Sequence, residues 1–160
     1  MIQNHLTIID LVKTLCESLP TTVVLTDAQL DAPGPHVLYV NPAYEKMTGY
    51  KPEEVIGKSP RILQGRRTNK LILRQLRKSL QSKTHARARI TNYRKCGEEY
   101  ICDIAAWPII NEHGDITHFI ALEREIKRKR GRPPQTVEEE SWWLNALIEQ
   151  GKGHQNETLN

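Results

Sequence analysis

Residues 37–65 read VLYVNPAYEKMTGYKPEEVIGKSPRILQG, and this stretch decides the fold that the chain predicts. Its first residues, VLYV, are apolar and rich in β-branched and aromatic side chains, which predicts a strand over 36–40 with His36. Asn41 is a favoured helix cap and Pro42 suits the first helical position, so a helix should begin there and close at Gly49. A second helical turn or two is expected over 51–56. The stretch therefore predicts a strand that leads directly into two short helices.

The residues before this stretch predict a helix and a strand. Apolar side chains recur every three or four residues from 5 to 18, which is typical of an amphipathic helix, and Pro20 ends it. Residues 21–26, TTVVLT, alternate and are β-branched, which favours a strand. Residues 27–35 contain Asp, Gly and two prolines and should form a loop.

The residues after it predict one long helix and three strands. Leucines spaced for one helical face lie among basic residues over 69–83. Strand-like runs follow at 86–94, 99–110 and 116–125, separated by segments of turn composition. Two strands, short helices and three strands make an α+β domain: a five-stranded antiparallel sheet with helices over one face, and flanking helices at both ends.

Taken in order, the quoted stretch, NYRKCGEEY at 92–100 and PIINEHGDITHFIALEREI at 108–126 resemble a PAS domain over about residues 20–126. More narrowly, they resemble the flavin-binding LOV subfamily of blue-light sensors. The resemblance implies the PAS fold, with a small-molecule cavity between the sheet and the helices and cations at one mouth. It also implies a sensory module that relays the state of this cavity through its flanking helices to a protein partner.

The LOV pattern has a cysteine that forms a light-driven bond to the flavin, and here Pro60 stands in its place. Ser59 replaces the asparagine before it. Proline carries no thiol, so the resemblance predicts a LOV-like domain that cannot form the cysteinyl–flavin adduct at this position. The chain has three cysteines, Cys16, Cys96 and Cys102, and none of them substitutes for it in sequence.

Several other positions carry the residues that the resemblance assigns to flavin. Arg61 and Gln64 match the residues that face the phosphate and ribityl chain, and Arg77 matches a second phosphate arginine. Asn92 matches the first of two asparagines at the edge of the isoalloxazine ring. Two guanidiniums can bind a phosphate through charge-assisted hydrogen bonds. In each case an ordinary surface or strand-end residue is the alternative.

Two positions depart from the flavin pattern at the ring end. Cys102 replaces the second asparagine, and Glu123 replaces the glutamine that senses flavin N5. A thiol supplies the paired hydrogen bonds of an amide poorly, and a buried carboxyl needs a partner or a raised pKa. The cofactor prediction is therefore FMN or another flavin, with an empty cavity as the open alternative. A flavin redox sensor is one alternative function.

Composition limits the other functions. The 160 residues include no metal cluster, no nucleotide loop and no nucleophile–base pair, so we expect no metal site and no enzyme. No run approaches a membrane span and no secretory signal is visible, and the odd, scattered cysteines suit a reducing compartment. We expect a cytoplasmic protein without membrane contact.

The basic character is concentrated in one segment. Residues 124–134 carry six basic side chains and one acid, while the whole chain has a net charge of +4. Arg130–Pro133 reads RGRP, which resembles the arm that AT-hook proteins place in the minor groove of A·T-rich DNA. A DNA-associated transcriptional regulator is therefore the second alternative function, against a solvated linker. The predicted DNA-binding residues are Lys127, Arg128, Lys129, Arg130, Gly131, Arg132 and Pro133.

The residues beyond the arm predict one more helix. Thr136 and Glu139 form a capping-box pattern, and an apolar face with two tryptophans follows up to Gly151. That face must pack on the sheet or on a second chain, and we expect a homodimer. The predicted organisation is a flanking helix over 1–19, the PAS domain over 20–126, a basic arm over 127–135, an amphipathic helix over 136–151 and a disordered tail over 152–160.

Overall fold

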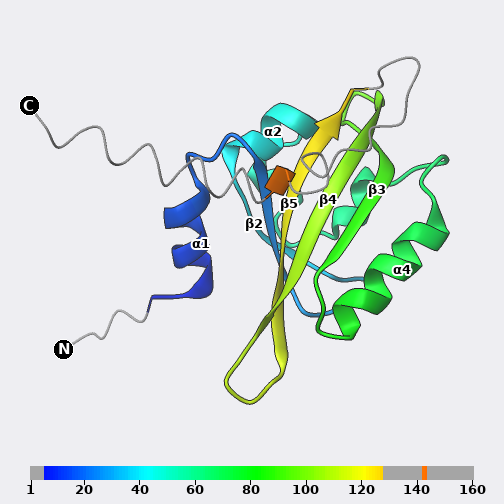
Figure 1. Cartoon of the computed structure of the whole chain (residues 1–160). Helices are drawn as coiled ribbons and strands as arrows, with labels where there is room; N and C mark the ends of the chain where they lie inside the picture. Colours follow the sequence, from blue (N-terminus) through cyan, green and yellow to red (C-terminus); the bar gives the residue numbers. More distant parts are fainter. Residues whose placement is uncertain (1–5, 128–141, 144–160) are drawn as a thin grey trace, which may run out of the picture. The chain divides into compact units, whose positions relative to one another are not determined.

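The computed structural model describes residues 6–127 together with residues 142 and 143 (Figure 1). The sequence-based prediction of an α+β fold is confirmed, because five antiparallel strands form one sheet with helices packed against it. The elements, in chain order, are α1 (Ile8–Cys16), β1 (Thr22–Asp27), β2 (Val37–Val40), α2 (Pro42–Thr48), α3 (Pro52–Val55), the 3-10 helix η1 (Pro60–Leu63), α4 (Lys70–Gln81), β3 (Ala86–Tyr93), β4 (Glu99–Ile110) and β5 (Ile116–Ile126).

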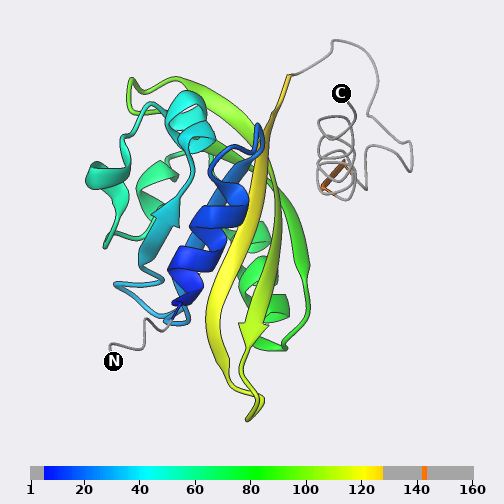
Figure 2. The ribbon, with the colours of Figure 1, turned by 90° about the vertical axis from the view of Figure 1, so that its left-hand side faces the viewer.

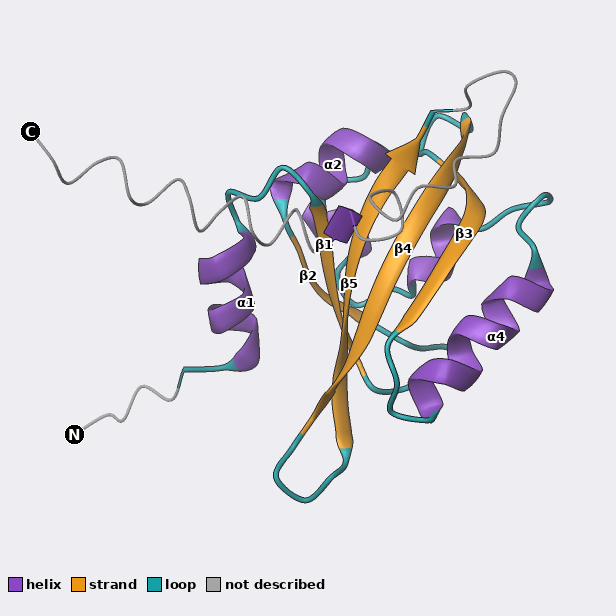
Figure 3. Ribbon diagram, in the orientation of Figure 1, coloured by secondary structure: helices purple, strands orange, loops and turns teal. Residues whose placement is uncertain are grey.

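The strands lie side by side in the order β2-β1-β5-β4-β3 (Figure 3). The first and last strands of the sheet in sequence are thus neighbours, and β5 pairs with β1 from Thr22 opposite Glu123 to Asp27 opposite His118. On its other side β5 pairs with β4. The central strand β5 therefore contacts both halves of the domain, and a change at one of its residues reaches β1 and β4 directly.

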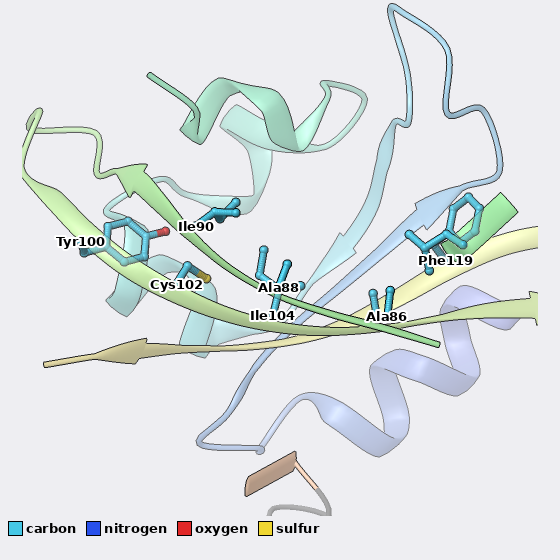
Figure 4. Close-up of a cluster of buried hydrophobic side chains, with 9 residues drawn as sticks. Ala86, Ala88, Ile90, Tyr100, Cys102, Ile104 and Phe119 are labelled. Carbon is cyan, nitrogen blue, oxygen red and sulfur yellow. The ribbon is translucent and has the colours of Figure 1, made fainter. Parts of the chain in front are cut away.

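The inner face of the sheet carries the core. Burial alternates strictly along β3, as expected for a strand with one face covered. Figure 4 shows the side chains of Ala88, Ile104 and Phe119 on this face, with Tyr100 and Cys102 towards one end. Leu80 of α4 packs into the same cluster. Helices α2, α3 and α4 contribute Tyr44, Val55 and Leu80 to the buried clusters on this side of the sheet, so the inner face forms a wall of the domain interior.

The outer face of the sheet carries an ion-pair cluster around Asp103 of β4. The Asp103 carboxylate is fully buried and accepts hydrogen bonds from Arg87 at 2.8 and 3.1 Å. Arg124 lies 3.3 Å and Arg89 3.7 Å from the same carboxylate. Strands β3, β4 and β5 are thus cross-linked through one acid that has three arginine neighbours.

Helix α1 is anchored to the sheet at its C-terminal end. Thr7 and Asp10 form a capping box at its start, and Tyr39 of β2 donates a 2.6 Å hydrogen bond to Glu17 just after its end (Figure 2). Tyr39 pairs with Leu25, on the face of the sheet opposite to the core. Leu11 and Leu15, 41% and 62% exposed, lie on the solvent side of α1.

Asn41 stands at the cap position of α2, as expected, but its side chain makes no capping bond. Its Oδ1 accepts a hydrogen bond from the Val23 amide at 2.9 Å, while its Nδ2 donates to the carbonyls of Thr21 at 2.8 Å and Cys16 at 3.1 Å. The fully buried amide therefore joins β1 to the end of α1.

Replacing Asn41 by Ala is expected to lower the free energy of unfolding by about 2 kcal/mol, because it leaves the buried Val23 amide without its partner. Asn41→Asp keeps the oxygen that accepts from the Val23 amide but loses the N–H that donates to the Cys16 carbonyl. This variant therefore tests the contribution of the hydrogen bonds from Nδ2 alone. Hydrogen exchange of the Val23 amide should accelerate in Asn41→Ala and stay slower in Asn41→Asp. Unchanged exchange in both variants would contradict this role.

Candidate functional site

A cavity of about 500 Å³ lies between the inner face of the sheet, α4, η1 and the loop after β1. This volume falls within the usual range for small-molecule sites. Aliphatic and aromatic side chains form most of its walls, and they come from both layers: Val24, Leu30, Leu63, Leu73, Leu76, Leu80, Ile90, Ile104, Ala106, Phe119 and Ala121. Such walls suit a flat, apolar ligand body that is held between sheet and helix.

Four cations line the solvent side of this cavity and are called the cationic rim: Arg61, Lys70, Arg74 and Arg77. Arg61 donates to the carbonyls of Leu30 and Gly34, and Arg77 donates to the Leu30 carbonyl at 3.1 Å. Arg77 also forms an ion pair with the exposed Asp31. Both predicted phosphate arginines thus line the cavity and hold the loop after β1.

Sequence reasoning missed Lys70 and Arg74 as members of the rim. Both lie on α4 with Arg77, at spacings of four and three residues, which places the three cations on one helical face. The helical spacing of these basic residues could therefore have predicted that Lys70 and Arg74 lie on the same face of the helix as Arg77. Asn69 is the N-cap of helix α4, and its Oδ1 accepts hydrogen bonds from the amides of Leu71 at 2.9 Å and Ile72 at 3.3 Å.

Five polar side chains gather at the opposite, buried end and are called the buried polar end: Tyr44, Asn92, Tyr100, Cys102 and Glu123. Asn92 and Glu123 line the cavity itself. Asn92 is only 3% exposed, and its Oδ1 has no hydrogen-bond partner among the described residues. A buried acceptor without a partner is costly, so this oxygen is suited to a ligand donor.

Glu123 is the charged group most strongly affected by this environment. Its carboxyl is 8% exposed, and burial raises its pKa to about 7, while a hydrogen bond from Cys102 acts weakly in the opposite direction. The Cys102 thiol donates to Oε2 at 3.7 Å. Burial also raises the pKa of Cys102 well above its usual value, with the nearby Glu123 adding to the effect. Cys102 is therefore a neutral thiol at physiological pH, whereas Glu123 changes between its neutral and ionised forms at about pH 7.

Two tyrosines of the buried polar end were not predicted as site residues. The hydroxyls of Tyr44 and Tyr100 are buried, with the side chains of Thr48 and Asn92 as their polar neighbours, and neither tyrosine lines the cavity. Burial raises the pKa of both, and proximity to Glu123 contributes in each case. The sequence held no signal for them, because aromatic residues in a strand or helix are most often ordinary core.

Of the remaining predicted positions, some line the cavity and one lies next to a residue that lines it. Pro60 and Gln64 line the cavity, so the position that carries the reactive cysteine in the LOV pattern faces the ligand space as proline. Cys102 does not line the cavity and reaches it only through Glu123. Among the described cavity-lining residues there is no cysteine, since Cys16 is half-buried elsewhere and Cys96 is exposed.

Other predictions fall outside the part of the chain that the structure describes. Of the predicted DNA-binding residues only Lys127 is described, and residues 128–133 lie beyond it. The chain divides into residues 1–127 and 128–160, and the cavity belongs wholly to the first unit. Within the described residues, no group of three or more His, Cys, Asp or Glu could hold a metal ion, and no helix is long and apolar enough to cross a membrane.

Known proteins share this architecture and sequence pattern. The domain family described as PAS domain matches residues 21–128. A nitrogen fixation regulatory protein of Klebsiella oxytoca is 29% identical over 113 residues, or 71% of this chain and 22% of that protein. A blue-light photoreceptor of Listeria monocytogenes is 30% identical over 105 residues, or 65% of this chain and 40% of that protein. The chain thus spans well under half of these relatives.

A solved structure gives the same result in three dimensions. The LOV domain of a blue-light activated histidine kinase from Erythrobacter litoralis EL346 superposes with a TM-score of 0.63 at 27% identity. The match covers 69% of this chain and 99% of that domain. The likeness therefore takes in a complete LOV domain and extends over most of this chain.

Proposed function

Since the chain belongs to the PAS domain family and is LOV-like within it, we propose that it is a sensory module whose cavity holds a flavin of the FMN type without forming a covalent cysteine bond. One observation carries the proposal: a single cavity has four cations at its solvent side and an unpartnered Asn92 oxygen at its buried end. A phosphate suits the first end, and the N–H of a flavin ring suits the second.

The residues present fit this ligand at most positions. Apolar walls suit the ring system, and a volume of about 500 Å³ suits a ligand of this class. The flavin, when bound, would supply light absorption and redox chemistry. The protein would contribute the cationic rim for the phosphate, Asn92 and Glu123 for the ring edge, and exclusion of water by the walls.

A route from the cavity to α1 follows from the hydrogen bonds of the sheet. Glu123 lies opposite Thr22 of β1, and the next residue, Val23, is held by Asn41. Asn41 in turn holds the carbonyl of Cys16 at the end of α1. A changed hydrogen bond at Glu123 would act on α1 through this route, which supports a relay to a partner. The exposed Leu11 and Leu15 of α1 suit a second copy of the chain as that partner.

The absorbance spectrum of the purified protein tests the proposal. We expect the blue band of a bound flavin, and we expect blue light to cause no reversible loss of this band, because Pro60 offers no thiol. Pro60→Cys places a thiol at the cavity wall and should introduce a reversible, light-driven loss of the blue band, whereas Pro60→Ser should not. A protein that carries no flavin and binds none on addition of FMN would refute the flavin proposal.

The RGRP segment favours a second function, binding of A·T-rich DNA through Arg130 and Arg132. The wild-type chain is then expected to bind an A·T-rich duplex with an affinity that falls steeply with salt. Arg132→Ala should abolish the preference over a G·C-rich duplex, while Arg74→Ala, a change of equal charge in the PAS domain, should not. Absence of binding at low salt would exclude this function.

A further inference from the structure

Glu123 has no compensating cation among the residues that the structure describes. Its carboxyl is buried in the cavity wall, and within that part of the chain the hydrogen bond that it accepts comes from the neutral Cys102 thiol at 3.7 Å. The cations that line the cavity are the four of the cationic rim, and they lie on η1 and α4 rather than on the sheet. A carboxylate in such a place is unfavourable unless it is protonated.

The groups that face Glu123 from the neighbouring elements are uncharged at neutral pH. From β4 they are Tyr100 and Cys102, from α2 Tyr44, and from β1 the cross-strand neighbour Thr22. The nearest acid on its own strand, Glu125, is paired at 2.7 Å with Arg94.

Arg94 is in turn committed to other groups. It pairs with Glu98 at 3.3 Å and stacks 4.6 Å from the centre of the Tyr100 ring. Its largely buried guanidinium is thus engaged by Glu125, Glu98 and the Tyr100 ring, and no hydrogen bond or ion pair among the described residues joins it to Glu123.

Protonation decides what Glu123 offers to a ligand. An ionised carboxylate only accepts hydrogen bonds, whereas a carboxylic acid presents one O–H donor and one carbonyl acceptor, as a glutamine amide presents an N–H donor and an acceptor. The carboxyl group of Glu and the amide of Gln also have nearly the same shape. A neutral Glu123 can therefore both donate and accept a hydrogen bond, as an amide can. A glutamate that is ionised at neutral pH could only accept hydrogen bonds at this position.

Of the residues at the buried polar end, Asn92 and Glu123 line the cavity and can meet a ligand. Asn92 Oδ1 needs a donor, and the O–H of a neutral Glu123 needs an acceptor. A cyclic imide edge, in which a ring N–H stands between two carbonyls, offers both. A carbonyl of such an edge meets repulsion from an ionised Glu123 and a hydrogen bond from a neutral one.

We propose that Glu123 recognises the flavin ring edge as an uncharged carboxylic acid, in place of an amide, so that binding of the ring takes up one proton from solvent wherever Glu123 is ionised in the ligand-free protein. The inference rests on the proposed flavin function and adds a pH dependence to it. Sensing at this cavity then responds to proton concentration as well as to the state of the flavin.

The test is the affinity of the ligand-free, full-length chain for FMN between about pH 6 and pH 9. For the wild type, the dissociation constant should rise about tenfold per pH unit once Glu123 ionises, which begins at about pH 7. Glu123→Gln places an amide that does not titrate at this position, so the rise of the dissociation constant with pH should disappear. Glu125→Gln makes the same chemical change two residues along β5, outside the cavity lining, and should keep the wild-type profile.

Riboflavin, which lacks the phosphate, serves as a second probe because the phosphate itself titrates near pH 6. Its pH profile should match that of FMN above pH 7. Equal pH profiles for wild type and Glu123→Gln would overturn the role of Glu123 and leave the flavin site standing. Failure of all variants to bind either flavin at any pH would overturn the flavin site and this inference together.

Discussion

Replacing Glu123 by Gln is expected to stabilise the ligand-free protein by about 3 kcal/mol above pH 7. The carboxyl has a pKa of about 7 in the folded chain against 4.5 as a reference for the unfolded chain, and burial is the cause. Keeping an ionised carboxylate in the cavity wall therefore costs free energy that a neutral amide of the same shape does not cost.

The sign of the pH dependence follows from proton counts. Between pH 4.5 and about 7 the folded chain binds more protons at Glu123 than the unfolded chain does. The contribution of Glu123 to stability is therefore complete below pH 4.5, falls as pH rises towards 7, and levels off above it. Glu123→Gln removes this fall, so the two proteins should differ least at acidic pH and most at alkaline pH.

Urea unfolding curves of both proteins, recorded from about pH 4.5 to pH 8.5, measure this difference. Glu125→Gln is the matched control, because Glu125 is partly exposed and paired with Arg94, and it should gain no stability with rising pH. If the stabilities of wild type and Glu123→Gln run parallel across the whole range, Glu123 is not a buried acid of raised pKa.

The Asp103→Ala variant is expected to lose about 3 to 5 kcal/mol of stability. The Asp103 carboxylate has no exposed surface and is in contact with Arg87 at 2.8 Å and Arg124 at 3.3 Å, across three strands of the sheet. Removing the acid leaves mutually repelling guanidiniums on the outer face and a void in place of the carboxylate. A loss of this size would leave a domain of ordinary stability close to unfolding.

Two further variants separate the causes. Asp103→Asn keeps the shape and removes the charge, so its loss should be smaller than that of Asp103→Ala. Asp115→Ala removes an exposed acid from the turn before β5 and should change stability by less than about 0.5 kcal/mol. A thermal midpoint for Asp103→Ala equal to that of the wild type would show that the cluster contributes nothing.

Local pattern predicted the elements of this fold because each one is set by neighbouring residues. The strand-like composition of 86–94 and the leucine spacing along 69–83 are properties of single segments, and a strand and a helix are found there. The order of the strands in the sheet, in contrast, depends on contacts between segments that are far apart in the sequence. The pairing of β1 with β5 joins residues about a hundred positions apart, so no local pattern in the sequence indicates it.

The site was predictable where residue type alone indicates a role. Arg61 and Arg77 do line the cavity, but their partners Leu30 and Gly34 are distant in sequence, so their contacts were out of reach. The burial of Glu123 was implied only by the resemblance to LOV domains, because glutamate is rarely buried in proteins and the environment of Glu123 comes from other strands. The pKa of Glu123 is raised because tertiary packing buries a side chain that would otherwise be expected at the surface.

The two arginines that hold the loop after β1 have one more consequence. A free arginine on a protein surface must give up much of its rotational entropy when it binds an anion, which can cost 1 to 2 kcal/mol for so long a side chain. Arg61 and Arg77 are already held by the Leu30 carbonyl, so most of that entropy is lost during folding. A phosphate that arrives at these guanidiniums meets preorganised donors, and more of the interaction energy is retained as affinity.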